Sequence, residues 1–410
     1  MEIAVFCYSL QPSLQPIAYS LSEAERPMRI PITSKLPAVG TTIFTVVSQR
    51  ARELGAIDLA QGFPDYDAPA RLKDLVAYHV AAGHNQYAPM AGVASLREQI
   101  ALKFASQHGR LLDPDEEITI TLGATEGLFS SIQALVHPGD EVIVFDPAYD
   151  SYAPAVTLAG GRAVHLPLDP PGFRIDWQRV RDAVSPRTRM LIVNNPHNPT
   201  GNVLDGTELD LLADVLRDTP VIVLADEVYE HMVFDGARHV SVCAHPELTG
   251  RSIGVFSFGK TMHATGWRVG YCIAPPRFTT ELRRVHQFNT FSIVTPLQLA
   301  LADFLKESPQ HCAGLADFYE SKRNRLLELL RNSSFSWTPS AGTYFQLLNF
   351  SAISDRSDFE FADRLIRGSG VAAIPVSPFY AVPVQLAVLR FCFAKNDSTL
   401  EEAAERLCRL

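Results

Sequence analysis

Between residues 118 and 274 the chain alternates short apolar segments with segments of helical pattern. The apolar segments cover residues 118–122, 141–145, 190–193, 221–225, 253–258 and 269–274. Because these segments are mostly apolar throughout, we expect strands that are buried on both faces. Such strands, joined by helices, form a mainly parallel sheet between two layers of helices. The sequence therefore predicts an α/β fold whose ligand site lies beyond the carboxyl ends of the strands.

The pattern changes near residue 306, where a smaller α+β domain is expected to begin. A long helix is predicted at 314–331, short strands at 335–337, 343–348, 371–373 and 386–393, and helices near 359–367 and 400–408. We divide the chain into a leader at 1–28, an N-terminal arm with part of the small domain at 29–70, a large domain at 71–305 and a small C-terminal domain at 306–410. The leader has no signal or transit pattern. We expect it to be poorly ordered, with Met28 as an alternative start.

Lys260 follows the apolar segment at 253–258 after a single glycine. Lysine is rarely buried without a partner, so the ordinary interpretation is a surface lysine at a strand end. If Lys260 is buried, its charged form is disfavoured, and the neutral amine is a nucleophile that can form a Schiff base. The neighbouring Ser257, Gly259 and Thr261 favour this second interpretation, because small or hydroxylic side chains suit a crowded loop near a phosphate.

Asp226 ends the apolar segment at 221–225, and two interpretations are open for it. An acid at this junction can cap a following helix. A buried carboxylate can instead keep a pyridine nitrogen protonated, so that the ring accepts electrons. Tyr229 and Asn198 would then bond with a phenolic oxygen on the same ring, although Asn198 alone would be interpreted as a turn residue.

Three segments carry groups that suit a phosphate. Residues 123–125 precede a helix, whose N–H groups and dipole favour an anion. Ser257 adds a hydroxyl, and Arg268 adds a forked positive charge. Each signal is weak alone, because many strand-to-helix turns look alike, but together they predict a phosphate cup. Tyr149 offers an aromatic face for a planar ring, although most aromatic residues at strand ends serve packing.

Arg390 lies inside the apolar strand expected at 386–393. An unpaired guanidinium is costly to bury, so Arg390 needs an anion. The carboxylate of a substrate is the obvious bidentate partner. A structural ion pair is the alternative, because buried charges are commonly paired.

Several motifs, taken together and in order, carry a resemblance to a known family. They are QGFPD at 61–65, QYAP at 86–89, NPHNPTG at 195–201, DEVY at 226–229, SFGKT at 257–261 and GWRVG at 266–270. Over about residues 30–410 the chain resembles a fold-type I, pyridoxal-phosphate-dependent aminotransferase of class I/II. It is most similar to the branch of methionine and kynurenine (glutamine-type) aminotransferases. The resemblance implies a large domain with a mainly parallel seven-stranded sheet, and pyridoxal 5'-phosphate (PLP) as the cofactor.

The resemblance also assigns roles to individual residues. For catalysis and for the cofactor ring, it implies Lys260 as the Schiff-base lysine and proton shuttle, Asp226 on the pyridine nitrogen, Asn198 and Tyr229 on the phenolic oxygen, and Tyr149 stacked on the ring. For the phosphate, it implies Ala124, Thr125, Ser257 and Arg268, with Tyr87 reaching over from a neighbouring subunit. For the substrate carboxylate, it implies Gly62, Asn198 and Arg390. A homodimer with shared active sites follows from the role of Tyr87.

The implied reaction moves the amino group of a neutral or aromatic L-amino acid, of the methionine, phenylalanine, kynurenine or glutamine type, to a 2-oxo acid. Relatives that prefer dicarboxylates use a second cation from the partner subunit. The corresponding segment here, residues 286–292, contains no arginine or lysine but includes Phe288 and Phe291. Arg283 and Arg284 lie just upstream and are the remaining possible source of a cation.

Two other functions are compatible with parts of the pattern. A β-lyase acting on cysteine conjugates or cystathionine shares the same site residues. Release of pyruvate and ammonia from an S-substituted cysteine without an oxo acid would indicate the lyase. A ligand-sensing module fused to a DNA-binding domain is disfavoured, because the chain has no basic helix-turn-helix segment and retains Lys260.

Composition restricts the partners. The formal charge of −9 disfavours nucleic acid and anionic membranes. No apolar segment reaches the roughly 18 residues of a membrane-spanning helix. The six cysteines are scattered without a C-x-x-C pair, and the histidines show no metal-ligand spacing. We therefore expect no metal site, reduced thiols and a cytoplasmic location.

Overall fold

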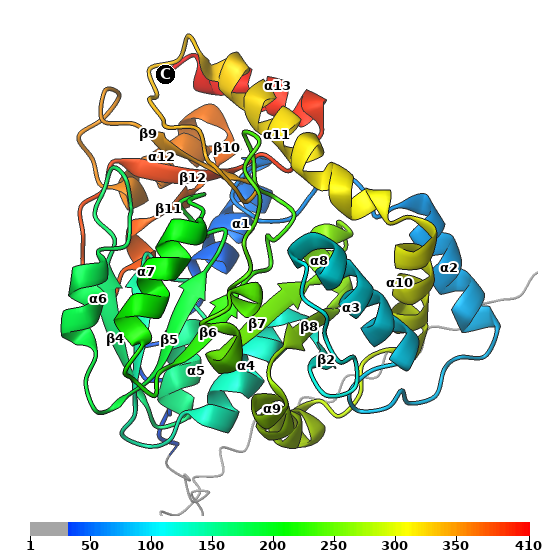
Figure 1. The fold of residues 1–410 in the computed structure, drawn as a ribbon. Coiled ribbons are helices and arrows are strands. Elements are labelled where there is room, and N and C mark those ends of the chain that lie inside the picture. Colours follow the sequence, from blue (N-terminus) through cyan, green and yellow to red (C-terminus); the bar gives the residue numbers. More distant parts are fainter. Residues whose placement is uncertain (1–31) are drawn as a thin grey trace, which may run out of the picture. The chain divides into compact units, whose positions relative to one another are not determined.

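A seven-stranded sheet forms the centre of the computed structural model, which describes residues 32–410 (Figure 1). Its order is β2-β8-β7-β6-β5-β3-β4. The strands are β2 (Ile118–Thr121), β3 (Glu141–Asp146), β4 (Arg162–Pro167), β5 (Thr188–Asn194), β6 (Ile222–Asp226), β7 (Ser252–Ser257) and β8 (Gly270–Ile273). Strands β3 to β7 pair in parallel, whereas β8 is antiparallel to both of its neighbours. The predicted mainly parallel α/β sheet is confirmed.

Successive side chains of the central strands enter two different cores, which explains why these strands are apolar throughout. In β5, Met190 and Ile192 pack in a cluster with α4 and α5, whereas Leu191 and Val193 pack in a cluster with α6 and α7. The helices around the sheet are α2 (Ala70–Ala81), α3 (Ala94–His108), α4 (Gly123–Leu135), α5 (Tyr152–Leu158), α6 (Trp177–Ala183), α7 (Gly206–Leu216), α8 (Phe258–Thr261), α9 (Pro276–Asn289) and α10 (Thr295–Glu307).

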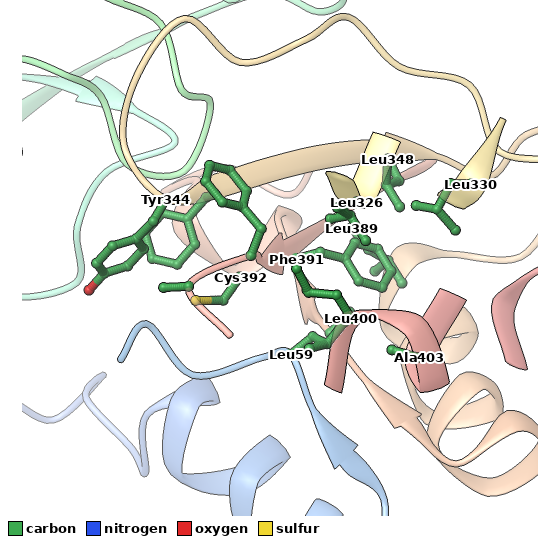
Figure 2. Packing of buried hydrophobic residues seen from close by; sticks show 14 of the residues in the cluster. Leu59, Leu326, Leu330, Tyr344, Leu348, Leu389, Phe391, Cys392, Leu400 and Ala403 are labelled. Carbon is green, nitrogen blue, oxygen red and sulfur yellow. The ribbon is translucent and has the colours of Figure 1, made fainter. Parts of the chain in front are cut away.

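The C-terminal part contains a smaller antiparallel sheet in the order β11-β12-β9. Its strands are β9 (Phe345–Asn349), β11 (Ile374–Pro375) and β12 (Val388–Cys392), and its helices are α11 (Gln310–Leu330), α12 (Asp358–Ser369) and α13 (Asp397–Leu407). Figure 2 shows their core, in which Leu326 and Leu330 of α11 pack with Leu389 and Phe391 of β12.

The N-terminal segment joins this C-terminal part. After α1 (Ile43–Leu54), strand β1 (Ile57–Asp58) pairs in parallel with β10 (Val371–Ala372). Leu59 packs in the core shown in Figure 2. These contacts are compatible with the division at residues 71 and 306, which stays a prediction. The leader expected at 1–28 lies outside the described residues.

Some elements differ from the sequence pattern. The strand expected at 335–337 is absent, and only an isolated bridge joins Ser336 to Asn349. Strand β4 was not predicted, because it is an edge strand with partly exposed, mixed side chains such as Arg162 and His165. The 3-10 turns are η2 (Val242–Ala244), η3 (Thr249–Arg251), η4 (Thr265–Trp267) and η5 (Ser377–Phe379). No helix within residues 32–410 is long and apolar enough to cross a membrane.

Candidate active site

A cavity of about 240 Å³ lies at the carboxyl ends of β5, β6 and β7 and the N-terminus of α4. Every predicted site residue except Tyr87 lines it: Gly62, Ala124, Thr125, Tyr149, Asn198, Asp226, Tyr229, Ser257, Lys260, Arg268 and Arg390. The lining also contains residues to which the sequence analysis gave no individual role: Phe44, Gln61, Phe63, Leu128, Asn194, Val228 and Phe345. Segments that are far apart in the chain therefore form one site.

Lys260 lies on the short helix α8, immediately after β7. Its Nζ donates hydrogen bonds to the hydroxyl of Tyr344 at 2.7 Å and to the carbonyl of Gly62 at 3.2 Å. Burial lowers the pKa of Lys260 to about 8. The interpretation as a solvated surface lysine is therefore wrong. Part of the Lys260 population carries a neutral, nucleophilic amine near neutral pH.

Asp226 is the last residue of β6, and only 5% of its surface is exposed. Its Oδ2 accepts a hydrogen bond of 2.6 Å from the hydroxyl of Tyr152. Burial raises the pKa of Asp226 to about 6. No helix begins directly after β6, so the helix-cap interpretation is wrong. The carboxylate has no ion-pair partner in the described part of the chain and suits a cationic group of a ligand.

Asn194, at the end of β5, links two of the predicted residues. Its Nδ2 donates to the backbone carbonyl of Asp226 at 2.8 Å, and its Oδ1 accepts from the backbone N–H of Asn198 at 2.7 Å. Oδ1 of Asn198 in turn accepts from Arg390 at 2.8 Å. The sequence carried a signal for Asn194, because it too stands at the carboxyl end of a parallel strand.

Arg390 lies in the middle of β12 and is 1% exposed. Besides Asn198, it donates to the carbonyl of Ala60 at 2.9 Å, and its Nε has no partner. The ring of Phe345 lies 3.8 Å from the guanidinium carbon. Among residues 32–410 no carboxylate forms an ion pair with Arg390, so the structural ion-pair alternative is wrong. The guanidinium is suited to an external anion.

The predicted phosphate cup lies where α4 begins. Gly123 has a φ of +70°, and a Cβ atom there would lie 2.6 Å from Nη2 of Arg268. The absence of a side chain therefore lets the guanidinium approach the free N–H groups of the helix. Arg268 also donates to Oγ1 of Thr125 at 3.4 Å. Neutral and cationic donors converge here, which suits a phosphate.

Two aromatic residues of the prediction have different positions. Tyr149 lines the cavity and lies edge-on to Tyr152, with ring centroids 5.7 Å apart. Tyr87 is 83% exposed and contacts Phe291 edge-on, with centroids 5.4 Å apart. Tyr87 therefore does not reach the cavity of its own chain.

Comparison with known proteins identifies the family. The family model "Aminotransferase class I and II" matches residues 55–407. The chain belongs to the class I and II aminotransferases. The resemblance inferred from the motifs is therefore confirmed.

This aminotransferase is similar to named relatives along almost its whole length. It is 51% identical to methionine aminotransferase of Escherichia coli, over 92% of this chain and 98% of the relative. It is 31% identical to kynurenine--oxoglutarate transaminase 1 of Rattus norvegicus, over 91% of this chain and 96% of the relative. A crystal structure from E. coli, reported with a methionine aminotransferase function, has a TM-score of 0.92 at 50% identity and covers 93% of this chain and 100% of that one.

The aminotransferase uses PLP, and the residues of the cavity fit it. The start of α4 with Arg268 suits the phosphate, and the unpaired buried carboxylate of Asp226 suits a protonated ring nitrogen. Lys260 supplies an amine with a lowered pKa. When bound, PLP supplies the electron sink for the reaction. Among residues 32–410 no group of His, Cys, Asp and Glu is arranged to hold a metal ion.

Proposed function

We propose that this aminotransferase moves the amino group of a neutral or aromatic L-amino acid to a 2-oxo acid, with Lys260 as the lysine that carries PLP. The observation that carries the proposal is Arg390, a buried guanidinium without a carboxylate partner in the cavity that Lys260 lines. Every amino acid and 2-oxo acid has a carboxylate for this group. Arg390 orients the substrate through this carboxylate, while the amine of Lys260 moves a proton at the substrate Cα.

The remaining cavity residues receive the following roles. Asp226 holds the proton on the ring nitrogen, and Asn198 and Tyr229 bond with the phenolic oxygen. Tyr149 stacks on the ring. The phosphate is held by Ala124, Thr125, Ser257 and Arg268, and the substrate carboxylate by Gly62, Asn198 and Arg390.

The proposed substrate class is supported by relatives and by the segment at 286–292. The two curated relatives carry the names of methionine and kynurenine as substrates. Arg283, one of the two cations just upstream of this segment, donates hydrogen bonds to Thr119 and to the carbonyls of Asp115 and Ile118. It is therefore held on the chain and not free to pair with a side-chain carboxylate of a substrate.

We also propose a homodimer in which Tyr87 completes the phosphate cup of the partner. Tyr87, Phe288, Phe291 and Val294 are exposed apolar side chains on two neighbouring segments. The segments are tied together, because Ser292 donates to the carbonyl of Ala88 at 3.0 Å. A second copy of the chain is the occupant that this surface suits. A cytoplasmic location is proposed as well, since the five cysteines of residues 32–410 are free.

Borohydride reduction followed by peptide mapping tests the proposal. The enzyme loaded with PLP is expected to be yellow, and reduction is expected to fix the cofactor on Lys260. The variant Lys260→Ala should fold but should show neither the visible band nor the adduct. Lys395→Met, a change at a buried lysine that does not line the cavity, is the control that should retain both. An adduct on a different lysine, or one that persists in Lys260→Ala, would contradict the proposal.

A further inference from the structure

Tyr344 is a fully buried tyrosine that contacts the amine of Lys260, and no role follows for it from the motifs. Figure 2 shows Tyr344 at the edge of the core of the C-terminal part, with its hydroxyl pointing away from the labelled leucine side chains. The oxygen lies 2.7 Å from Nζ of Lys260. The hydroxyl proton is donated to the carbonyl of Gly62. Because Tyr344 donates this proton to Gly62, its oxygen acts as the acceptor of the hydrogen bond from Lys260.

Close packing holds the hydroxyl in place. The ring of Tyr344 lies edge-on to Tyr229 and to Phe345, with centroids 5.1 and 4.8 Å away. Gly62 approaches these rings directly, since a Cβ atom there would lie 2.7 Å from Phe345 and 3.4 Å from Tyr344. A ring confined in this way cannot follow a moving lysine, so the lysine must come to the hydroxyl.

The hydrogen bonds of Lys260 also fix the direction of its lone pair. A neutral amine has two N–H donors, and the oxygens of Tyr344 and Gly62 accept both. In the part of the chain that the structure describes, Nζ has no third hydrogen-bond partner, and Lys260 lines the cavity. We propose that Tyr344 and the carbonyl of Gly62 hold the unattached amine of Lys260 with its lone pair directed into the cavity. Tyr344 is thereby a positioning residue that directs the lone pair of Lys260 toward the substrate proton.

This inference rests on the proposed role of Lys260, and the charges around Lys260 support it. Burial lowers the pKa of Lys260 to about 8, so that the amine is partly neutral at working pH. Tyr229 and Tyr344 stay uncharged, because burial raises the pKa of both hydroxyls. The charged or titratable groups that act on the amine are Asp226 and Cys392, which favour the ammonium, and Arg268 and Arg390, which disfavour it.

Removing the hydroxyl of Tyr344 is therefore expected to lower the pKa of Lys260 further. An acceptor stabilises the ammonium more than the neutral amine, so its loss favours the neutral form. The variant Tyr344→Phe keeps the ring and its packing. We expect the pKa to fall by about one pH unit, the size of one hydrogen bond to a charged donor. We also expect kcat to fall by about tenfold or more, because the lone pair of Lys260 is no longer held in the direction of the substrate proton.

The test uses the full chain loaded with the aminated cofactor, in which Lys260 is not attached. Trace acetylation with acetic anhydride between about pH 6 and 10, read by mass spectrometry of the Lys260 peptide, gives the pKa without any measurement of activity. Tyr319→Phe is the matched control, because this buried hydroxyl bonds with His263 and not with Lys260. The control should give the wild-type profile, whereas in Tyr344→Phe the amine of Lys260 should titrate at lower pH.

Overlapping profiles for Tyr344→Phe and wild type would overturn the inference, even if Lys260 still carries PLP. An adduct that maps to another lysine would overturn the proposed function instead, so the two failures are distinguishable. If Tyr344→Phe does not fold, 3-fluorotyrosine at position 344 keeps the ring and hydroxyl but weakens the oxygen as an acceptor. A smaller shift in the same direction would then support the inference, and no shift would overturn it.

Discussion

Tyr152 donates a hydrogen bond of 2.6 Å to Oδ2 of Asp226, and within residues 32–410 it is the only side chain that donates to this carboxylate. The hydrogen bond favours the ionised form, but burial outweighs it and raises the pKa of Asp226 to about 6. An ionised Asp226 without a cationic ligand is therefore unfavourable. The carboxylate of Asp226 therefore suits a cationic ligand, which would favour its ionised form.

The first prediction concerns the stability of the cofactor-free chain. The pKa of Asp226 rises from 3.8 to about 6 on folding, so the folded state binds more protons between these values. Stability is thus lost as pH rises through this window, by about 3 kcal/mol in total. We expect Asp226→Asn to be more stable than wild type at pH 8 by about 2 kcal/mol, and the difference to vanish near pH 4. Urea unfolding at the two pH values measures this, and equal stability at pH 8 would refute it.

The second prediction concerns activity. Asp226→Asn is expected to lower kcat by about a thousandfold, because the ring nitrogen loses its anionic partner and the ring its strength as an electron sink. Tyr152→Phe leaves the carboxylate in place and should lower kcat by only about tenfold. Steady-state kinetics at saturating PLP compares the two variants. Wild-type turnover by Asp226→Asn with bound PLP would exclude this role.

The boundaries of several elements follow from local signals. Helix α1 begins after Thr42, whose hydroxyl accepts from the N–H of Thr45, and ends at Gly55 with a φ of +60°. The strand ends and their polar residues were likewise readable from the apolar pattern. This is why the sequence alone assigns Lys260 and Asp226 to one site.

The residues that were missed depend on three-dimensional direction. Tyr152 is the first residue of α5 and Tyr344 lies just before β9, and nothing in their sequence neighbourhood tells which way the hydroxyl points. Phe345 was missed for the same reason, although its ring covers Arg390. Long-range packing decides these contacts, and periodicity alone does not encode them.

The third prediction concerns the carboxylate-binding group. Arg390→Lys keeps a positive charge but loses the planar fork and the hydrogen bonds with Asn198 and Ala60. The KM for the amino donor is expected to rise by about a hundredfold, with a smaller effect on kcat. Arg284→Lys, an exposed change at a residue paired with Glu281, is the control that should leave KM unchanged. An unaltered KM in Arg390→Lys would show that the carboxylate binds elsewhere.

The fourth prediction concerns shared sites. Tyr87 is exposed in its own chain, so its proposed phosphate contact must be made across a subunit boundary. When Tyr87→Ala and Lys260→Ala subunits are mixed in equal amounts and allowed to exchange, about a quarter of all sites should be intact by statistics. Activity should therefore reappear from two inactive preparations. A lack of recovery after demonstrated subunit exchange would contradict the shared site.

The last prediction concerns substrate choice. His286 is fully buried and contacts Glu126 and the carbonyl of Met90, so it is not available to a substrate carboxylate. Phe288, 86% exposed, is the next large side chain of this segment. Burying the second carboxylate of aspartate beside such a surface without a cation is strongly unfavourable.

We therefore expect kcat/KM for methionine and phenylalanine to exceed that for aspartate by at least about a hundredfold, because an unpaired carboxylate costs several kcal/mol to bury. Phe288→Arg and Phe291→Arg should each narrow this gap, since they place a cation on the segment that would face the partner's cavity. Arg284→Ala is the control, because its charge is exposed and paired with Glu281. If Arg284 instead served aspartate, this variant would lower activity with aspartate alone. A higher kcat/KM for aspartate than for methionine and phenylalanine in the wild-type enzyme would refute the proposed substrate class while leaving Lys260 in its role.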